Sequence, residues 1–280
     1  MNCINVNLST KTFNKLKVLV YEISGIYFSE QKKYLLETRL SKRLSALNLL
    51  NFEDYYNYLK YSSEKELEIK ELLNSVTTNE TSFFRDMPQL KIFVDILKQI
   101  ISTNSFGAYK KIRIWSAGCS TGEELYTVAI LIKENIFSSN IEFEIVGTDI
   151  SEKVLSSAKN GIYNGYALRN ASEAVLRKYF NKIDDDTYSI KDEIKNITVF
   201  RNINLMDVKE IKLLNLFDVV LCRNVIIYFD AESKKKAVVN IYTGLKTGGY
   251  LFLGHSESLH SVSTLFKLVG IGKTPLYRKE

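Results

Sequence analysis

The feature that most constrains this fold is a strand, a glycine turn and a helix in immediate succession, within Lys111–Glu124. Ile112 to Trp115 is a short apolar run with a β-branched residue at alternate positions, which predicts a strand. The run breaks at Ser116-Ala117-Gly118, and an amphipathic segment then begins at Gly122 and continues to Ile132. This order is typical of the first half of a nucleotide-binding α/β unit.

The residues of the turn argue against a dinucleotide ligand. Gly118 and Gly122 have the spacing G-x-x-x-G rather than G-x-G-x-x-G. A pyrophosphate would sit on the helix N-terminus, where Glu123 and Glu124 would repel it. A cofactor with a cationic head fits better, and S-adenosylmethionine (SAM), which carries a sulfonium and an α-ammonium group, is the expected ligand. The alternative is that both glutamates only complement the helix dipole as surface charges.

Composition places the chain among ordinary globular proteins. Its 280 residues are 45% hydrophobic and 25% charged, enough for one large domain and a smaller one. We expect a cytoplasmic protein, because no run of eighteen apolar residues occurs and the first residues lack an apolar signal core. Because Cys3, Cys119 and Cys222 are scattered and only two histidines occur, we expect neither a metal site nor a disulfide framework. The net charge of +6 permits an acidic partner without requiring nucleic acid.

The first quarter of the chain has the pattern of a helical bundle. Phe13 to about Leu73 shows helical periodicity with few glycines. Its clearest helix is expected at Glu30–Leu49, where leucines form one stripe and the cations Lys32, Arg39 and Arg43 lie in a second stripe beside it. These cations could dock an acidic helical partner, or they could be the solvated face of the bundle.

A connector of residues 75–86 follows, in which β-branched and hydroxyl residues are too frequent for a helix interior. Asn79, Thr81 and Arg85 stand two and four residues apart, a spacing that could place them around one pocket. The alternative is that Thr81 or Ser82 only caps the next helix.

Polar residues follow the next two predicted strands. Ile141 to Gly147 has the alternation of a strand and leads into Asp149, whose carboxylate could accept hydrogen bonds from both hydroxyls of a ribose. A helix cap is the weaker alternative, because Ser151 lies closer to the following helix. Ile197 to Phe200 predicts another strand, and Asn204 follows it at the carboxyl edge, where open α/β sheets bind ligands. Asn204 could therefore meet a base edge, or it could serve a turn.

The remaining pattern completes an α/β fold. Leu216 to Cys222 is almost wholly apolar, which predicts a central strand covered on both faces. An inserted hairpin is expected at about residues 180–196. Gly248-Gly249 is expected to turn the chain before a strand that starts at Tyr250. Two short runs, Phe266–Val269 and Leu276–Arg278, predict an antiparallel hairpin at the sheet edge.

Five stretches match one family: VTTNETSFFRD, IWSAGCSTGEELY, GTDIS, LCRNVIIYFD and GGYLFLGHSES. In this order and spacing they resemble the CheR-type methyltransferases, which esterify glutamates of bacterial chemotaxis receptors. The resemblance runs essentially from end to end. It implies an α/β fold: a SAM-dependent methyltransferase Rossmann-like sheet, mostly parallel with an antiparallel edge hairpin, plus a small all-α N-terminal domain and a small inserted β-hairpin subdomain. The implied division is a helical domain at 1–75, a linker at 76–90 and the methyltransferase domain at 91–280.

The resemblance also implies roles for individual residues. Arg85 and Tyr228 are expected near the transferring methyl group. Lys32, Arg39 and Arg43 would read the methylation helices of the receptors. The residues expected around SAM are Asn79, Thr81, Arg85, Glu123 or Glu124, Asp149, Asn204, Leu205, Asn224 and Val225.

The resemblance implies a cytoplasmic monomer that is recruited to receptor arrays, meets the membrane only through the receptors and binds no nucleic acid. The inserted hairpin looks shorter than in members that use it to hold a receptor tail peptide, which argues against tail-dependent docking here.

The chain suits this chemistry on physical grounds as well. A glutamate carboxylate, with a reference pKa of about 4.3, is ionised at neutral pH and needs no general base to act as a nucleophile. The sequence accordingly shows no Ser-His-Asp or Cys-His arrangement. Catalysis would depend on aligning the carboxylate, the methyl group and the sulfur, with Arg85 orienting a carboxylate and Tyr228 fixing geometry.

Two rival functions remain open at this point. A nucleic-acid methyltransferase would favour an N-P-P-Y-like motif or a Pro-Cys nucleophile after the fourth strand, where this chain has Cys222-Arg223-Asn224-Val225. A non-catalytic module that binds SAM is disfavoured by the presence of Glu123, Asp149 and Asn224.

Overall fold

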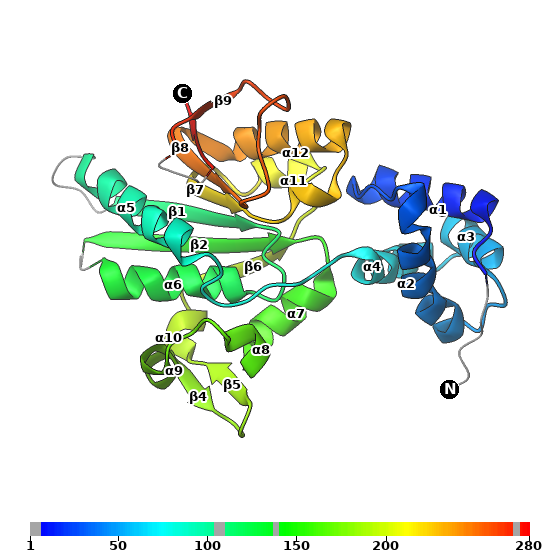
Figure 1. Ribbon diagram of the computed structural model, residues 1–280, viewed down its shortest axis with the longest axis horizontal. Coiled ribbons are helices and arrows are strands. Elements are labelled where there is room, and N and C mark those ends of the chain that lie inside the picture. Colours follow the sequence, from blue (N-terminus) through cyan, green and yellow to red (C-terminus); the bar gives the residue numbers. More distant parts are fainter. Residues whose placement is uncertain (1–6, 104–109, 137–139, 271–274) are drawn as a thin grey trace.

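The computed structural model describes residues 7–103, 110–136, 140–270 and 275–280 (Figure 1). It consists of a small helical bundle at the N-terminal end and a larger part in which helices cover a twisted sheet. Within the described residues, no helix is both long and apolar enough to cross a membrane.

The bundle is built from α1 (Thr10–Ser24), α2 (Lys33–Ala46), α3 (Phe52–Tyr61) and α4 (Lys65–Val76). Polar caps start two of these helices: Ser9 accepts from the Thr12 N–H and Asn51 accepts from the Asp54 N–H. The helices enclose a core of their own that includes Phe13, Leu36, Tyr55 and Leu72. The helix expected at Glu30–Leu49 is shorter, because its first turn, η1 (Glu30–Lys32), is a 3₁₀ turn and α2 ends at Ala46.

The larger part contains, among the described residues, a seven-stranded sheet in the order β6-β2-β1-β7-β8-β10-β9. Its parallel strands are β1 (Lys110–Ala117), β2 (Ile141–Asp149), β6 (Thr198–Asn202), β7 (Phe217–Cys222) and β8 (Leu245–Leu253). The antiparallel edge consists of β10 (Leu276–Lys279) and β9 (Phe266–Leu268), which confirms the predicted C-terminal hairpin.

Helices cover both faces of this sheet (Figure 1). Alternate residues of β1 point to opposite faces: Ile112 and Ile114 join a core with α5 (Met87–Thr103) and α6 (Glu123–Asn135). Trp115 and Ala117 join a second core with α11 (Val208–Lys212) and α12 (Ala231–Gly244). The residues of β7 divide between the same two cores, so the prediction of a central strand covered on both faces is confirmed.

A second, three-stranded sheet in the order β3-β5-β4 is inserted between β2 and β6. The expected hairpin forms as β4 (Phe180–Lys182) and β5 (Thr187–Ile190). A third strand, β3 (Ile162–Asn164), pairs with β5 and was not expected, because three residues are too few to show an alternating pattern. The insertion also carries the short helices α8 (Gly165–Leu168), α9 (Glu173–Tyr179) and α10 (Asp192–Lys195) and follows α7 (Glu152–Asn160), which Ser151 caps.

One local prediction is wrong, and one alternative left open above is excluded. Gly248-Gly249 does not turn the chain, because β8 already begins at Leu245 and passes through both glycines with a register shift against β7. A Cβ at Gly249 would lie 2.9 Å from the Lys246 carbonyl oxygen, so the bulge requires glycine there. Neither Thr81 nor Ser82 caps α5; Asp86 precedes it, and its Oδ1 accepts from the Gln89 N–H at 3.4 Å.

Candidate active site

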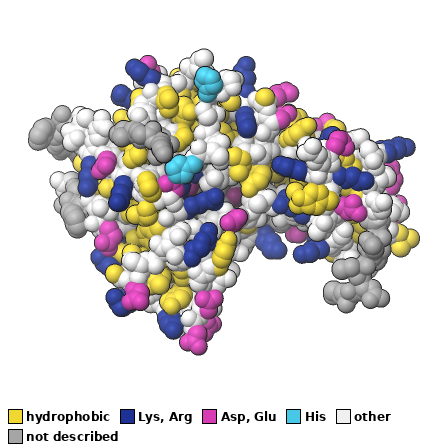
Figure 2. All heavy atoms as spheres, in the orientation of Figure 1, with side chains coloured by type: hydrophobic (Ala, Val, Ile, Leu, Met, Phe, Trp, Pro, Cys, Tyr) yellow, Lys and Arg dark blue, Asp and Glu magenta, His cyan; other side chains and the backbone are white. Residues whose placement is uncertain are grey.

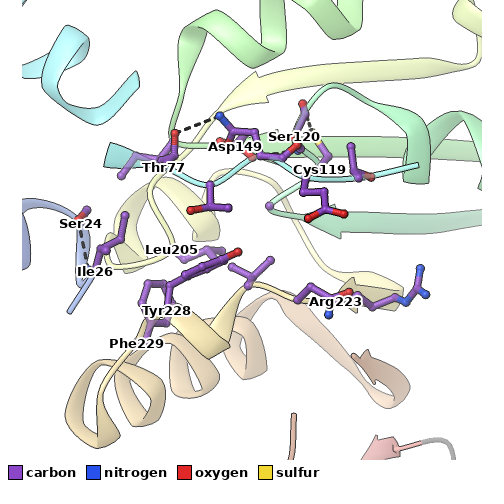
Figure 3. A pocket seen from close by; sticks show the side chains of 18 of the residues that line it. Ser24, Ile26, Thr77, Cys119, Ser120, Asp149, Leu205, Arg223, Tyr228 and Phe229 are labelled. Atoms are coloured by element: carbon purple, nitrogen blue, oxygen red, sulfur yellow. Dashed lines mark hydrogen bonds between the residues drawn. The ribbon is translucent and has the colours of Figure 1, made fainter. Parts of the chain in front are cut away.

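A cavity of about 170 Å³ lies at the carboxyl edge of the main sheet, where the bundle meets it (Figure 3). The strand order reverses between β1 and β7, which is the position where open α/β sheets bind ligands. The loops that leave these two strands, Gly118–Ser120 and Arg223–Val225, both line the cavity. Its volume would hold on the order of ten water molecules, so it is large enough for an organic ligand.

Asp149 is held at one wall of the cavity by the loop after β1. The Ser120 N–H donates to Asp149 Oδ2 at 2.9 Å and the Ser151 N–H donates to Oδ1 at 3.0 Å. Burial raises the pKa of Asp149, and hydrogen bonds from the backbone of Ser151, Ser120 and Ile150 oppose that rise. Each carboxylate oxygen can accept more than one hydrogen bond, which suits the pair of hydroxyls on a ribose.

The opposite wall is largely apolar. In Figure 3, Leu205, Tyr228 and Phe229 lie across the cavity from Asp149 and Ser120. Val225 packs against Gly118 at this wall. A Cβ added to Gly118 would lie 2.5 Å from Val225 Cγ2. Gly118 also has a φ of +81°, so both conformation and space require glycine at this turn. These apolar surfaces suit a flat base or a thioether.

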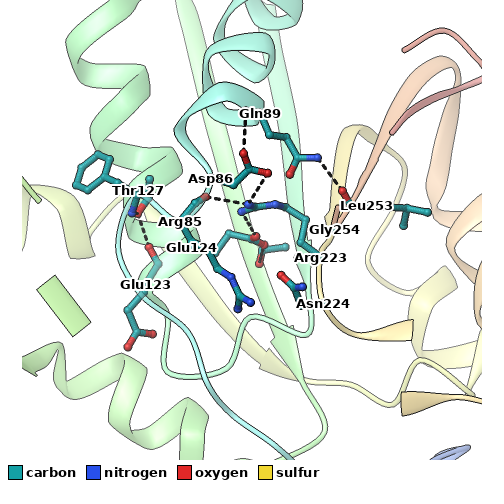
Figure 4. A network of polar contacts seen from close by, with 12 residues as sticks. Arg85, Asp86, Gln89, Glu123, Glu124, Thr127, Arg223, Asn224, Leu253 and Gly254 are labelled. Atoms are coloured by element: carbon teal, nitrogen blue, oxygen red, sulfur yellow. Dashed lines mark hydrogen bonds and ion pairs between the residues drawn. The ribbon is translucent and has the colours of Figure 1, made fainter. Parts of the chain in front are cut away.

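Glu124 lines the cavity and belongs to a largely buried polar network around Arg223 (Figure 4). Its Oε2 accepts from Arg223 Nη1 at 2.9 Å and its Oε1 accepts from the Ser116 hydroxyl at 2.7 Å. Arg223 Nη2 donates to the Arg85 carbonyl at 2.8 Å and lies 3.7 Å from Asp86 Oδ2. Asp86 Oδ2 also lies 2.8 Å from His255 Nε2. Of the two carboxylates in the network, Glu124 lines the cavity, where it can face a cation.

The two adjacent glutamates have different environments. Glu124 lines the cavity, whereas Glu123 is buried outside it and accepts hydrogen bonds from the Thr121 hydroxyl at 2.7 and 2.8 Å. Figure 4 shows Glu123 pointing away from the network around Arg223. Burial raises the pKa of Glu123. The structure therefore brings only Glu124 to the ligand space.

The connector contributes the three residues that its spacing suggested. Asn79, Thr81 and Arg85 all line the cavity. The Asn79 carbonyl accepts from the Ser120 hydroxyl at 2.9 Å, which ties the connector to the loop after β1. Arg85 Nη1 donates to the Glu80 carbonyl at 3.2 Å, an arrangement that occupies one of the five N–H donors of the guanidinium.

Asn224 and Val225 are placed by a buried carboxylate. Glu257 Oε2 accepts from the N–H groups of Asn224 at 2.8 Å and Gly254 at 2.7 Å, and its Oε1 accepts from the Val225 N–H at 2.9 Å. This holds Asn224 in the left-handed region, with a φ of +60°, at the edge of the cavity. Glu257 therefore supports the wall from behind and does not line the cavity itself.

Asn204 lines the cavity, but its amide already has two partners. Its Nδ2 donates to the Ile23 carbonyl in α1 at 2.6 Å, and its Oδ1 accepts from the Met206 N–H at 2.9 Å. The second of these bonds is the turn role left open above, and the first joins the sheet part to the bundle.

The three cations grouped on the predicted helix lie in different places. Lys32, which is exposed at the mouth, and Arg39, which is half-buried, line the cavity from the bundle side. Arg39 Nη2 also donates to the Thr78 hydroxyl at 2.7 Å. Arg43 does not line the cavity; its Nε and Nη2 bind the Glu68 carboxylate at 2.8 and 2.7 Å. Because the Glu68 side chain is only 5% exposed, this pair belongs to the bundle interior.

Sequence reasoning missed the central member of the network, Arg223. An arginine directly after the apolar run of β7 is the available signal, since a charge at the carboxyl end of a buried strand marks the ligand edge. It also missed Ile26 and Phe28 of the bundle, which line the cavity and whose apolar character gives no such signal.

The cysteines are not placed for covalent chemistry. Cys119 and Cys222 are buried, and burial raises the pKa of both thiols, which keeps them protonated at neutral pH. Cys3 lies outside the described residues. No group of three or more His, Cys, Asp and Glu side chains within the described residues could hold a metal ion.

Comparison with known proteins gives matches over almost the whole chain. Residues 11–77 match the family model described as CheR methyltransferase, all-alpha domain, and residues 79–274 match CheR methyltransferase, SAM binding domain. The chain is 36% identical to the chemotaxis protein methyltransferase of Borreliella burgdorferi, over 94% of this chain and 93% of that protein. It is 34% identical to chemotaxis protein methyltransferase 2 of Vibrio cholerae, over 95% and 92% of the two chains. It is 32% identical to the chemotaxis protein methyltransferase of Escherichia coli, over 94% and 90%.

Proposed function

Because the chain belongs to the CheR methyltransferase family, a family of SAM-dependent enzymes, we propose that it transfers the methyl group of SAM to glutamate side chains of chemotaxis receptors. The products would be glutamate methyl esters and S-adenosylhomocysteine. The proposal includes the substrate, the roles of the site residues and the recruitment of the enzyme to receptors.

Each part of SAM is proposed to meet a matching set of cavity residues. Asp149 would accept hydrogen bonds from the ribose hydroxyls, and Leu205 with Val225 would pack against the base. Glu124 would face the cationic part of the ligand, and its ion pair with Arg223 holds it in place. Asn79, Thr81 and Asn224 add polar contacts from the connector and from the loop after β7. Bound SAM supplies an electrophilic methyl group on a positively charged sulfur.

The residues of the chain are suited to align an anionic nucleophile and not to activate it. Among the described residues, no histidine lines the cavity, and its one cysteine, Cys119, is held protonated by burial. A glutamate carboxylate needs no base at neutral pH. Arg85 would orient a carboxylate, either of the substrate or of the methionine moiety, and Tyr228 would fix the approach. Positioning of this kind can supply much of the rate.

The observation that carries the proposal is the charge that each part of the chain brings to the cavity. The sheet part contributes the carboxylates of Glu124, which is paired with Arg223, and of Asp149, whereas the bundle contributes the cations Lys32 and Arg39. A cationic cofactor fits beside the carboxylates, and an acidic substrate fits beside the bundle cations. Lys32 and Arg39 are therefore proposed to receive the receptor glutamate and its acidic neighbours.

The face shown in Figure 2 argues against nucleic acid as the substrate. Cationic and anionic side chains are interspersed over it, with no continuous basic surface of the kind that tracks a phosphate backbone. The chain has 38 basic and 32 acidic residues, in line with this mixture.

The test is transfer of a labelled methyl group from SAM to receptor-containing membranes. We expect label that base releases as methanol, since glutamate methyl esters are base-labile. Receptor with the acceptor glutamates changed to alanine is the control and should take up no label. Base-stable label on nucleic acid, or cofactor binding without transfer to any receptor, would contradict the proposal.

A further inference from the structure

The bundle reaches the backbone of Tyr228. Ile26, in the segment that follows α1, forms an antiparallel bridge with Phe229. The Tyr27 N–H donates to the Tyr228 carbonyl at 3.0 Å. Ile26, Tyr27 and Tyr228 all line the cavity. A piece of the bundle is thus hydrogen-bonded to the residue whose side chain is proposed to guide the nucleophile.

Two side-chain hydrogen bonds hold α1 on the larger part. The Tyr21 hydroxyl donates to Asp230 Oδ1 at 3.2 Å, two residues beyond Tyr228. The Asn204 amide donates to the Ile23 carbonyl at 2.6 Å. Tyr21 does not line the cavity, so its effect on the reaction would have to pass through the contact between the two parts.

The fit between the two parts is close at Gly25. This residue ends α1 with a φ of +74°, and a Cβ there would lie 2.7 Å from Met206 Sδ. Met206 is in turn fixed by the hydrogen bond from its N–H to Asn204 Oδ1 at 2.9 Å. The end of α1 therefore packs directly against the turn that carries Asn204.

We propose that Tyr21 and Asn204 are positioning residues for methyl transfer: by holding α1 on the larger part, they keep Ile26 and Tyr27 paired with the backbone of Tyr228 and Phe229. This pairing fixes the Tyr228 ring and its hydroxyl in the cavity. This inference rests on the proposed function, which gives Tyr228 its role. In this arrangement the bundle completes the reaction centre in addition to facing the substrate.

Tyr21→Phe tests the inference with the smallest change, because it removes only the hydroxyl. The matched control is Tyr58→Phe, which removes the same group from a hydroxyl–carboxylate bond inside the bundle, between Tyr58 and Glu64 Oε2 at 3.0 Å. We expect kcat for methyl transfer to fall about fivefold in Tyr21→Phe and to stay within about twofold in Tyr58→Phe. Equal kcat values for the two variants would overturn the inference.

Asn204→Asp is the second variant. Its carboxylate keeps an acceptor for the Met206 N–H but presents an oxygen, in place of a donor, to the Ile23 carbonyl. We expect kcat to fall by at least as much as in Tyr21→Phe. If Asn204 instead contacts the base of the cofactor, the affinity for S-adenosylhomocysteine would fall while kcat at saturating SAM stayed normal, and that result would overturn its positioning role.

A variant cycle with Tyr228→Phe shows whether the effect passes through the Tyr228 hydroxyl. Adding Tyr21→Phe to Tyr228→Phe should leave kcat unchanged, because there is then no hydroxyl to misplace. If the reduction of kcat in the double variant equals the product of the reductions in the two single variants, Tyr21 does not act through the Tyr228 hydroxyl.

Hydrogen exchange in the full chain separates this inference from the proposed function, since it needs no substrate. We expect peptides that cover residues 25–28 to exchange faster in Tyr21→Phe than in Tyr58→Phe. If they do and the wild type methylates no receptor, the proposed function fails and takes the role in methyl transfer with it. If exchange is unchanged and the wild type is active, the positioning role alone is wrong.

Discussion

Arg223 Nη1 lies 2.9 Å from Glu124 Oε2 in an ion pair of which neither side chain is more than 14% exposed. The pair joins the loop after β7 to the first turn of α6, across the point where the strand order reverses. Such a pair is costly to break from one side, since the partner that remains is a buried charge without a counter-charge. It gives the first of four predictions.

Arg223→Ala should lower the free energy of unfolding by about 3 kcal/mol, because Glu124 loses its cationic partner, whereas Asp86 keeps its contact with His255 Nε2 at 2.8 Å. Urea unfolding of the full chain measures this. Arg177→Ala is the control: its ion pair with Glu173 is exposed on both sides, and its loss should cost less than about 0.5 kcal/mol. Similar values for both variants would show that the buried pair contributes no more than a surface pair.

Asp149→Asn should weaken the affinity for S-adenosylhomocysteine about 10- to 100-fold, the expected loss when one or two hydrogen bonds to a charged group become neutral. Burial places the pKa of Asp149 above its ordinary 3.8. The affinity of the wild type should therefore fall as the pH is lowered toward that raised pKa, whereas the affinity of Asp149→Asn should change less. Calorimetry as the pH is lowered from 7 would show both effects, and parallel pH curves would speak against the ribose contact.

Lys32→Ala should change KM for the receptor and not the stability, whereas Arg43→Ala should lower the stability. Lys32 lies at the cavity mouth, so its loss should raise KM for the receptor severalfold and leave the free energy of unfolding unchanged. Arg43 neutralises the buried Glu68, so its loss should cost about 3 kcal/mol of folding stability. Urea unfolding combined with receptor-methylation kinetics would separate the two. If Arg43→Ala instead raised KM for the receptor without lowering the free energy of unfolding, Arg43 would belong to the substrate-binding surface.

Glu144→Gln should lower stability at neutral pH by about 2 kcal/mol, allowing for partial exposure of the carboxylate. The hydrogen bond from Arg113, followed by that from Lys111, holds the pKa of Glu144 at about 2 against an ordinary 4.5. Its contribution is therefore complete above pH 4.5 and is lost as the pH falls toward 2. Urea unfolding should show the difference between variant and wild type shrinking from pH 7 to pH 3; a constant difference would contradict this linkage.

Much of the fold could be predicted from local patterns. The alternation in β1 and the apolar run of β7 depend only on which side chains face a covered sheet, and both strands are central in the structure. Ser151 could be identified as a cap because a serine directly before an amphipathic run can accept a hydrogen bond from a free N–H of the first helical turn. The inserted β3 could not be predicted, since its pairing with β5 joins residues more than twenty positions apart in sequence.

The site was predictable where a side chain and its sequence neighbours decide the outcome. Asp149 after a strand and the connector residues around Arg85 do reach the cavity. Sequence could not separate Glu123 from Glu124, because helix rotation decides which of two adjacent carboxylates faces the ligand. Nor could it show that Arg43 is neutralised by Glu68, a partner 25 residues away on another helix.

The cavity takes its walls from both the bundle and the sheet, with Ile26 on one side and Asp149 on the other. Any molecule that fills it touches both, so its binding free energy adds to the cohesion of the two parts. The supply of methyl donor would then set more than the rate of the reaction. In a cell short of the donor, the bundle of this enzyme would be less firmly joined to its sheet part.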